Sequence, residues 1–89
     1  MTEVTRSDVR AFILDSVAGG LAAKRLEPSS VPDDFDLLLE GLIDSFGLIE
    51  LLGSLEARFQ VELDATEIDV DVLTLVGPLS DYVARSAAD

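Results

Sequence analysis

Apolar residues recur at helical spacing near the beginning of the chain. Thr5 precedes this stretch as a candidate N-cap, and Asp8 follows three residues later in the pattern of a capping box. The pattern predicts a first helix, which Gly19 and Gly20 weaken near its end, although the following LAAKRL continues the helical character for about another turn. The inward stripe consists of Val9, Phe12, Ile13 and Val17.

The most regular stretch runs from about residue 45 to residue 59. Its polar face carries Glu50, Ser54, Glu56 and Arg58, and either Asp44 or Ser45 can serve as the N-cap. This stretch is the most secure helix of the chain. Its apolar face consists of Leu48, Leu51, Leu52, Leu55 and Phe59.

Residues 27–44, between these two helices, are rich in Pro, Ser and Asp and predict a long loop. Leu37, Leu38 and Leu39 interrupt the loop, and we expect them to form one turn that inserts into the core and anchors the loop. After the second helix, residues 60–63 alternate polar and apolar side chains. We read them as an extended connector that places Val61 and Leu63 in the core.

The C-terminal third predicts two further helices. Residues 65–72 favour a short acidic helix that carries Ile68, and Thr74 is expected to cap a last helix with Pro78 in its first turn. Val76, Leu79 and Val83 are expected inside, with Tyr82 beside them. The expected fold is all-α: a small four-helix bundle with a long loop between helices 1 and 2 and a short helix 3, in a single domain over residues 1–89 with its core at about 5–86.

Composition argues against a self-sufficient catalyst. The 89 residues include no Cys and no His, which removes thiolate nucleophiles, the commonest general base and the commonest neutral metal ligand. Asp69 and Asp71 have the spacing of a calcium loop, but the positions that follow lack the Gly and the bidentate Glu that such a loop needs. We therefore expect neither catalytic residues nor a metal site.

The net charge of −12 is unevenly distributed. Residues 27–89 hold 15 of the 18 acidic residues against two arginines, Arg58 and Arg85. Such a field repels nucleic acid and anionic membranes and attracts proteins with basic patches. The N-terminus lacks the basic region followed by an apolar run that is typical of a signal peptide. No apolar run approaches the ~20 residues of a membrane span. We expect a cytoplasmic monomer.

The strongest candidate for chemistry is the pair Asp44-Ser45. The chain has 11 Asp and 8 Ser, so about one Asp-Ser pair is expected by chance, and a second pair does occur at Asp15-Ser16. The two differ in context, because Asp15-Ser16 lies within a helix whereas Asp44-Ser45 lies where a long loop meets a helix N-terminus. Such a terminus exposes a serine to a modifying enzyme and favours a phosphate. The alternative is an ordinary N-cap serine.

The stretch from Leu38 to Val83 resembles the acyl carrier and peptidyl carrier protein family, whose attachment motif is Asp-Ser followed by a large apolar residue. Within it, GLIDSFGLIELLGSLEARFQVEL (residues 41–63) matches the family's pattern through the second helix and the connector behind it. The resemblance implies that Ser45 carries 4′-phosphopantetheine as a phosphodiester, ending in a thiol that forms a thioester. Asp44 is then expected to orient the phosphopantetheinyl transferase and its Mg²⁺. The partner-facing residues implied on the same helix are Phe46 and Ile49 as apolar contacts, Glu50 and Glu56 toward basic residues, and Gly53.

Three functions stay open at this point. The first two share the phosphopantetheine arm and differ in cargo: an acyl group in polyketide or fatty-acid-like assembly, or an aminoacyl or peptidyl group in nonribosomal peptide synthesis. Their partners are a loading enzyme and a downstream synthase or transferase. Gly47, Gly53 and Ala57 stand where fatty-acid carriers often have acidic or bulky residues, and the lead-in LLEGLIDS resembles stand-alone carriers of specialised metabolism, such as antibiotic biosynthesis, and of aminoacyl loading. The third function is an acidic helical adaptor that binds a basic protein without modification.

Overall fold

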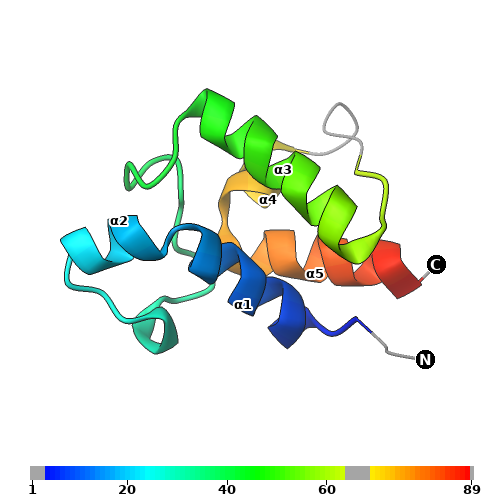
Figure 1. The fold of residues 1–89 in the computed structure, drawn as a ribbon, viewed down its shortest axis with the longest axis horizontal. Helices are drawn as coiled ribbons and strands as arrows, with labels where there is room; N and C mark the ends of the chain where they lie inside the picture. The colour runs from blue at the N-terminus through cyan, green and yellow to red at the C-terminus, as the bar shows by residue number, and fades with distance from the viewer. Residues whose placement is uncertain (1–3, 64–68, 89) are drawn as a thin grey trace.

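The structure is a computed structural model that describes residues 4–63 and 69–88. It arranges them as helices around one apolar core, which confirms the all-α prediction (Figure 1). The predicted first helix occurs as two consecutive helices, and residues 65–68 of the predicted helix 65–72 lie outside the described part. The helices are α1 (Arg6–Ser16), α2 (Ala18–Ala23), the 3-10 helix η1 (Pro28–Ser30), α3 (Ser45–Phe59), α4 (Val70–Thr74) and α5 (Val76–Ala88).

Helix α1 begins with the predicted capping box. The Thr5 hydroxyl accepts a hydrogen bond from the Asp8 N–H at 3.1 Å, and the Asp8 carboxylate accepts one from the Thr5 N–H at 3.2 Å. The helical path is interrupted at Val17 (φ −111°, ψ 19°) and not at the glycine pair, which lies inside α2. A Cβ on Gly20 would come within 2.8 Å of the Leu42 side chain, so this glycine lets α2 lie close to the loop that precedes α3.

The core lies where α1, α3 and α5 face one another. Helices α1 and α5 run side by side, and α3 crosses above them (Figure 1). Leu48 and Phe59, both assigned to the apolar stripe of α3, are only half-buried at the edge of this core. The buried apolar residues are Val9, Ile13, Leu14, Val17, Leu21, Val31, Leu37, Leu51, Leu52, Leu55, Val61, Leu73, Val76, Leu79 and Val83.

Asp36 organises the long loop. Its Oδ1 accepts hydrogen bonds from the N–H groups of Leu38 (3.0 Å) and Leu39 (2.9 Å), which is a local turn of the kind that Asp favours. Its Oδ2 accepts from the buried Thr74 hydroxyl at 3.3 Å, and its backbone forms an isolated antiparallel bridge with Leu75. The prediction that Thr74 caps the last helix is therefore wrong. Thr74 ends α4, and its hydroxyl is used to hold the loop.

The leucine triplet of the loop divides between core and surface. Leu37 is completely buried, Leu38 is half-buried, and Leu39 is 82% exposed. The expectation that all three insert into the core is wrong for Leu39, because the turn at Asp36 directs successive side chains to different sides. Of the three leucines, Leu37 is the one that anchors the loop in the core. Its N–H donates to the Thr74 carbonyl at 2.9 Å, and its carbonyl accepts from Leu42 and Ile43.

Ion pairs join the two ends of the fold. Arg6 Nη2 lies 2.6 Å from Asp33 Oδ2, and Arg6 Nε lies 2.5 Å from Asp81 Oδ1. These hydrogen bonds to Asp33 and Asp81 raise the pKa of Arg6. The pairs connect α1 to the long loop and to α5 at a partly exposed site, where each pair contributes little to stability on its own.

Pro78 occupies the third position of α5, so the prediction that it falls in the first turn is confirmed.

Candidate functional site

The loop meets α3 at Asp44, which is the N-cap of the helix. Asp44 has an extended backbone (φ −102°, ψ −172°), and its Oδ1 accepts a hydrogen bond from the Gly47 N–H at 2.7 Å. A Cβ on Gly47 would lie 3.1 Å from the Ile43 Cβ and 3.3 Å from Asp44 Oδ1, so glycine leaves room for this close cap. Of the two N-cap candidates, the structure selects Asp44.

Ser45 is the first residue of α3 and its side chain is exposed. Within residues 4–63 and 69–88, the Ser45 hydroxyl has no hydrogen-bond partner, because the capping role belongs to Asp44. The second Asp-Ser pair differs in this respect: the Ser16 hydroxyl donates to the Phe12 carbonyl of its own helix at 2.9 Å. A hydroxyl that is exposed, unpaired and held at a helix start is accessible to another enzyme.

Backbone N–H groups also converge at this end of α3. The Gly47 N–H is taken by the cap and the Leu48 N–H donates to the Asp44 carbonyl at 2.9 Å. The N–H groups of Ser45 and Phe46 have no acceptor in the described part of the chain. Two free donors at the positive end of a helix dipole favour an anionic group attached to the neighbouring hydroxyl.

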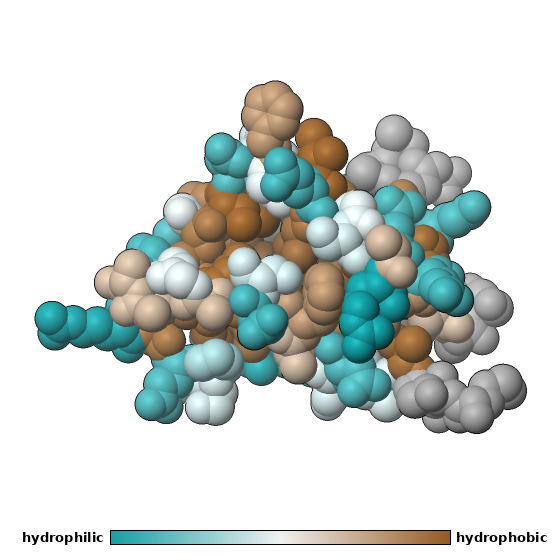
Figure 2. Space-filling model, viewed as in Figure 1, coloured by the Kyte–Doolittle hydropathy of each residue, from teal (hydrophilic) through white to brown (hydrophobic). Residues whose placement is uncertain are grey.

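The outward face of α3 carries the predicted partner-facing residues, with one exception. Phe46 is 78% exposed and Ile49 is 66% exposed, and Glu50 and Gly53 are exposed beside them. Figure 2 shows hydrophobic side chains standing out from the surface over α3. Glu56 is the exception: it is half-buried, and its Oε2 accepts a hydrogen bond from the Leu63 N–H at 3.1 Å, which ties the connector to the helix.

Leu39 is a surface residue that the sequence pattern did not reveal. Leu39, Phe46 and Ile49 are the large hydrophobic residues that the structure leaves exposed. A triplet of leucines favours burial, and only the preceding Asp36, as a turn former, indicated that the triplet does not act as one unit.

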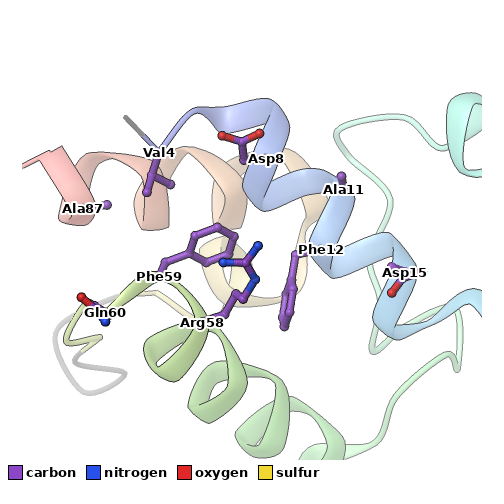
Figure 3. A pocket seen from close by; sticks show the side chains of 9 residues that line it. All are labelled: Val4, Asp8, Ala11, Phe12, Asp15, Arg58, Phe59, Gln60 and Ala87. Atoms are coloured by element: carbon purple, nitrogen blue, oxygen red, sulfur yellow. The ribbon is translucent and has the colours of Figure 1, made fainter. Parts of the chain in front are cut away.

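A cavity lies at the other end of α3 (Figure 3). It has a volume of about 1080 Å³ and lies between α1 and the C-terminal end of α3. The Phe12 and Phe59 rings meet edge to face at 5.6 Å, and the Arg58 guanidinium lies 5.4 Å from the centre of the Phe59 ring. Arg58 comes 13 residues after Ser45, or roughly 20 Å along a helix, so this cavity is separate from the serine.

Neither residues 4–63 nor residues 69–88 contain a cluster of three or more Asp, Glu, His or Cys side chains that could hold a metal ion. Among the same residues, no helix is both long enough and apolar enough to span a membrane.

Replacing Asp44 with alanine is expected to lower the free energy of unfolding by about 1 kcal/mol, since the cap of α3 is lost. For a domain of this size the melting temperature then falls by about 4–8 °C. Thermal unfolding followed by circular dichroism measures the change. Asp34→Ala serves as the control, because Asp34 is exposed in a turn and lies outside the cap. Equal melting temperatures for the two variants would contradict the capping role.

Comparison with known proteins finds relatives that share one name. The chain is similar to the D-alanyl carrier protein of Bacillus subtilis (strain 168), with 49% identity over 39 residues, which are 44% of this chain and 50% of the relative. A second relative of the same name, from Bacillus pumilus (strain SAFR-032), is 29% identical over 68 residues, 74% of this chain and 87% of the relative. The D-alanyl carrier protein of Bacillus velezensis (strain DSM 23117 / BGSC 10A6 / LMG 26770 / FZB42) is 47% identical over 38 residues.

The match at higher identity is local: the chain spans about half the length of the first of these relatives. No protein-family model matches the chain, and no solved structure does so either. The matching relatives share one name, and the sequence motif and the helical fold agree with it. These relatives, all named D-alanyl carrier protein, support the resemblance to the carrier protein family that the sequence motif indicated.

Proposed function

We propose that this protein is a non-catalytic carrier that holds an acyl or aminoacyl group as a thioester on a 4′-phosphopantetheine arm attached to Ser45. The observation that carries the proposal is that Asp44 and Ser45 have different roles at the start of α3. Asp44 caps the helix, which leaves the Ser45 hydroxyl exposed and unpaired within the described residues. An ordinary N-cap serine would instead use its hydroxyl to bind the helix.

The residues around Ser45 fit the proposed group. The arm is joined through a phosphodiester, and the N–H groups of Ser45 and Phe46 lie at the positive end of the α3 dipole, where they can donate to phosphate oxygens. Bound in this way, the arm supplies a thiol that forms thioesters, a function that the chain itself lacks because it contains no Cys. Ser45 supplies only the attachment point.

The attachment step requires an enzyme. The Ser45 hydroxyl oxygen forms a bond to the phosphorus of coenzyme A that bears the pantetheine, and the bond from that phosphorus to the departing 3′,5′-ADP breaks. The hydroxyl proton passes to a base of the phosphopantetheinyl transferase. Asp44, adjacent to Ser45, would help to orient that enzyme and its Mg²⁺.

The exposed face of α3 is the proposed contact surface for the transferase, a loading enzyme and a downstream synthase or transferase. Phe46 and Ile49 offer apolar contacts, with Glu50 and Gly53 beside them. Glu56 contributes less than the other residues, since its carboxylate already binds the connector. The name of the relatives favours an aminoacyl cargo. A polyketide, nonribosomal peptide or other antibiotic pathway is a further proposal about where the carrier acts.

The test is the intact mass of the purified protein after incubation with coenzyme A and a phosphopantetheinyl transferase of broad specificity. We expect a gain of one phosphopantetheine, which peptide mapping locates in the fragment that contains Ser45. A known carrier protein in the same reaction controls for enzyme activity. If the control is modified and this protein keeps its original mass, the carrier proposal fails and the acidic adaptor replaces it.

A further inference from the structure

A small cavity borders the same end of α3 as Ser45. It has a volume of about 210 Å³, enough for on the order of seven water-sized groups. Val17, from the turn between α1 and α2, and Ile43 and Leu51 provide its apolar lining. Its rim carries three polar residues that are also exposed to solvent, Glu50 and Ser54 on α3 and Ser16 on α1.

Within this cavity the polar groups differ in availability. The Ser16 hydroxyl is bound to the Phe12 carbonyl. The Ser54 hydroxyl and the Glu50 carboxylate have no partner among the described residues. Among the described residues that line the cavity, Glu50 is the one titratable residue, and none is a lysine or an arginine. An apolar wall with one free carboxylate and one free hydroxyl is complementary to a small group that bears an ammonium.

A depression connects this cavity with the attachment point. It is lined by Gly41, Leu42, Ile43, Asp44 and Gly47, and it shares Ile43 and Gly47 with the cavity. At 100° per residue, Gly47 and Ser54 lie on roughly the opposite side of α3 from Ser45. An arm from Ser45 must therefore pass over the N-terminal end of the helix, where the depression lies.

The length of the arm permits this path. Its backbone is about as long as five residues of extended chain, roughly 17 Å. Glu50 lies five residues beyond Ser45, which is about 7.5 Å along the helix axis. The charges along the path are those of Asp44 and Glu50, both negative, so a cargo that ends in a carboxylate meets no basic partner among the lining residues.

Resting on the proposed carrier function, we propose that the cavity between the α1–α2 turn and α3 holds a small aminoacyl cargo, with its ammonium at Glu50 and Ser54 and its side chain against Val17 and Leu51. The inference concerns the class of cargo and its location. Larger acyl chains exceed the volume of the cavity, and acidic acyl groups are repelled by Glu50.

The test compares three cargoes on the same arm, each attached from a coenzyme A analogue with a stable amide in place of the thioester: alanyl, propionyl and malonyl. Alanyl and propionyl differ by the ammonium alone. In ¹H–¹⁵N NMR spectra, we expect alanyl to shift the amide signals of Val17, Gly47, Glu50 and Ser54 relative to the unloaded arm. Propionyl is expected to shift them less, and malonyl not at all.

A pH titration of the ¹⁵N-labelled alanyl amine adds an electrostatic readout. The Glu50 carboxylate stabilises the ammonium, so the pKa of the amine is expected to be higher in the wild-type protein than in Glu50→Gln by about 0.5 to 1. Glu62→Gln is the matched control, since it removes the same charge from an exposed residue after the C-terminal end of α3. It is expected to leave the pKa of the amine near the wild-type value.

The outcomes separate this inference from the carrier function. If the arm attaches but alanyl and propionyl cause the same shifts, confined to residues next to Ser45, the cargo site is wrong and the carrier function stands. Equal lowering of the amine pKa by Glu50→Gln and Glu62→Gln would assign the effect to net charge and also overturn the site. If no arm attaches at all, both proposals fail.

Discussion

The Ser45→Ala variant will take up no phosphopantetheine under conditions in which the wild-type protein is fully modified. The arm needs a hydroxyl oxygen to form its bond to phosphorus, and alanine has none. Ser16→Ala is the matched control because it alters the second Asp-Ser pair, whose hydroxyl is bound within α1. Intact mass spectrometry measures both variants. A mass gain in Ser45→Ala, or its loss in Ser16→Ala, would contradict the assignment of Ser45 as the attachment point.

A stability measurement shows that this loss of modification is not caused by unfolding. Ser45 is exposed and Asp44 provides the cap, so Ser45→Ala is expected to change the free energy of unfolding by less than about 0.5 kcal/mol. Urea denaturation followed by circular dichroism provides the value. A decrease of 1 kcal/mol or more would mean that Ser45 shares the capping role.

The Leu37→Ala variant is expected to lose about 3 kcal/mol of unfolding free energy, within the range of about 2–5 kcal/mol for a buried leucine. Leu37 is completely buried, and its truncation leaves a void where the long loop meets α4. Domains of this size have a total stability of only about 5–15 kcal/mol, so this is a large fraction. Urea denaturation at 25 °C measures the decrease.

Leu39→Ala is the control for Leu37→Ala, since it makes the same chemical change two residues away. Leu39 is 82% exposed, and the expected change in unfolding free energy is below about 0.5 kcal/mol. Similar losses in the two variants would show that the triplet is buried as a unit. The Leu37 carbonyl accepts from Ile43, the residue before Asp44, so Leu37→Ala also tests whether core packing keeps Ser45 in place.

Much of the fold follows from local pattern. The capping box of Thr5 and Asp8 and the apolar period of α3 are properties of short segments, and both occur as predicted. The sequence predicts a weak point of the first helix at Gly19 and Gly20, whereas the structure interrupts it at Val17. The prediction rests on the low helix propensity of glycine, and in the fold Gly20 instead allows close contact with Leu42. The role of Thr74 was misassigned for a similar reason: its partner, Asp36, lies 38 residues away.

By itself the sequence determined the helical class of this protein, the position of its long helix α3, its acidic charge and the serine at the start of that helix. These features depend on residues that are near one another in the chain, or on composition alone. Only the tertiary structure decided that Asp44 is the cap and Ser45 is free, because both residue types cap helices equally well. It also decided that Leu37 is buried while Leu39 is exposed, and that a small cavity with Glu50 borders the attachment point. Such features depend on which distant segments pack together, and the local spacing of residues does not predict that packing.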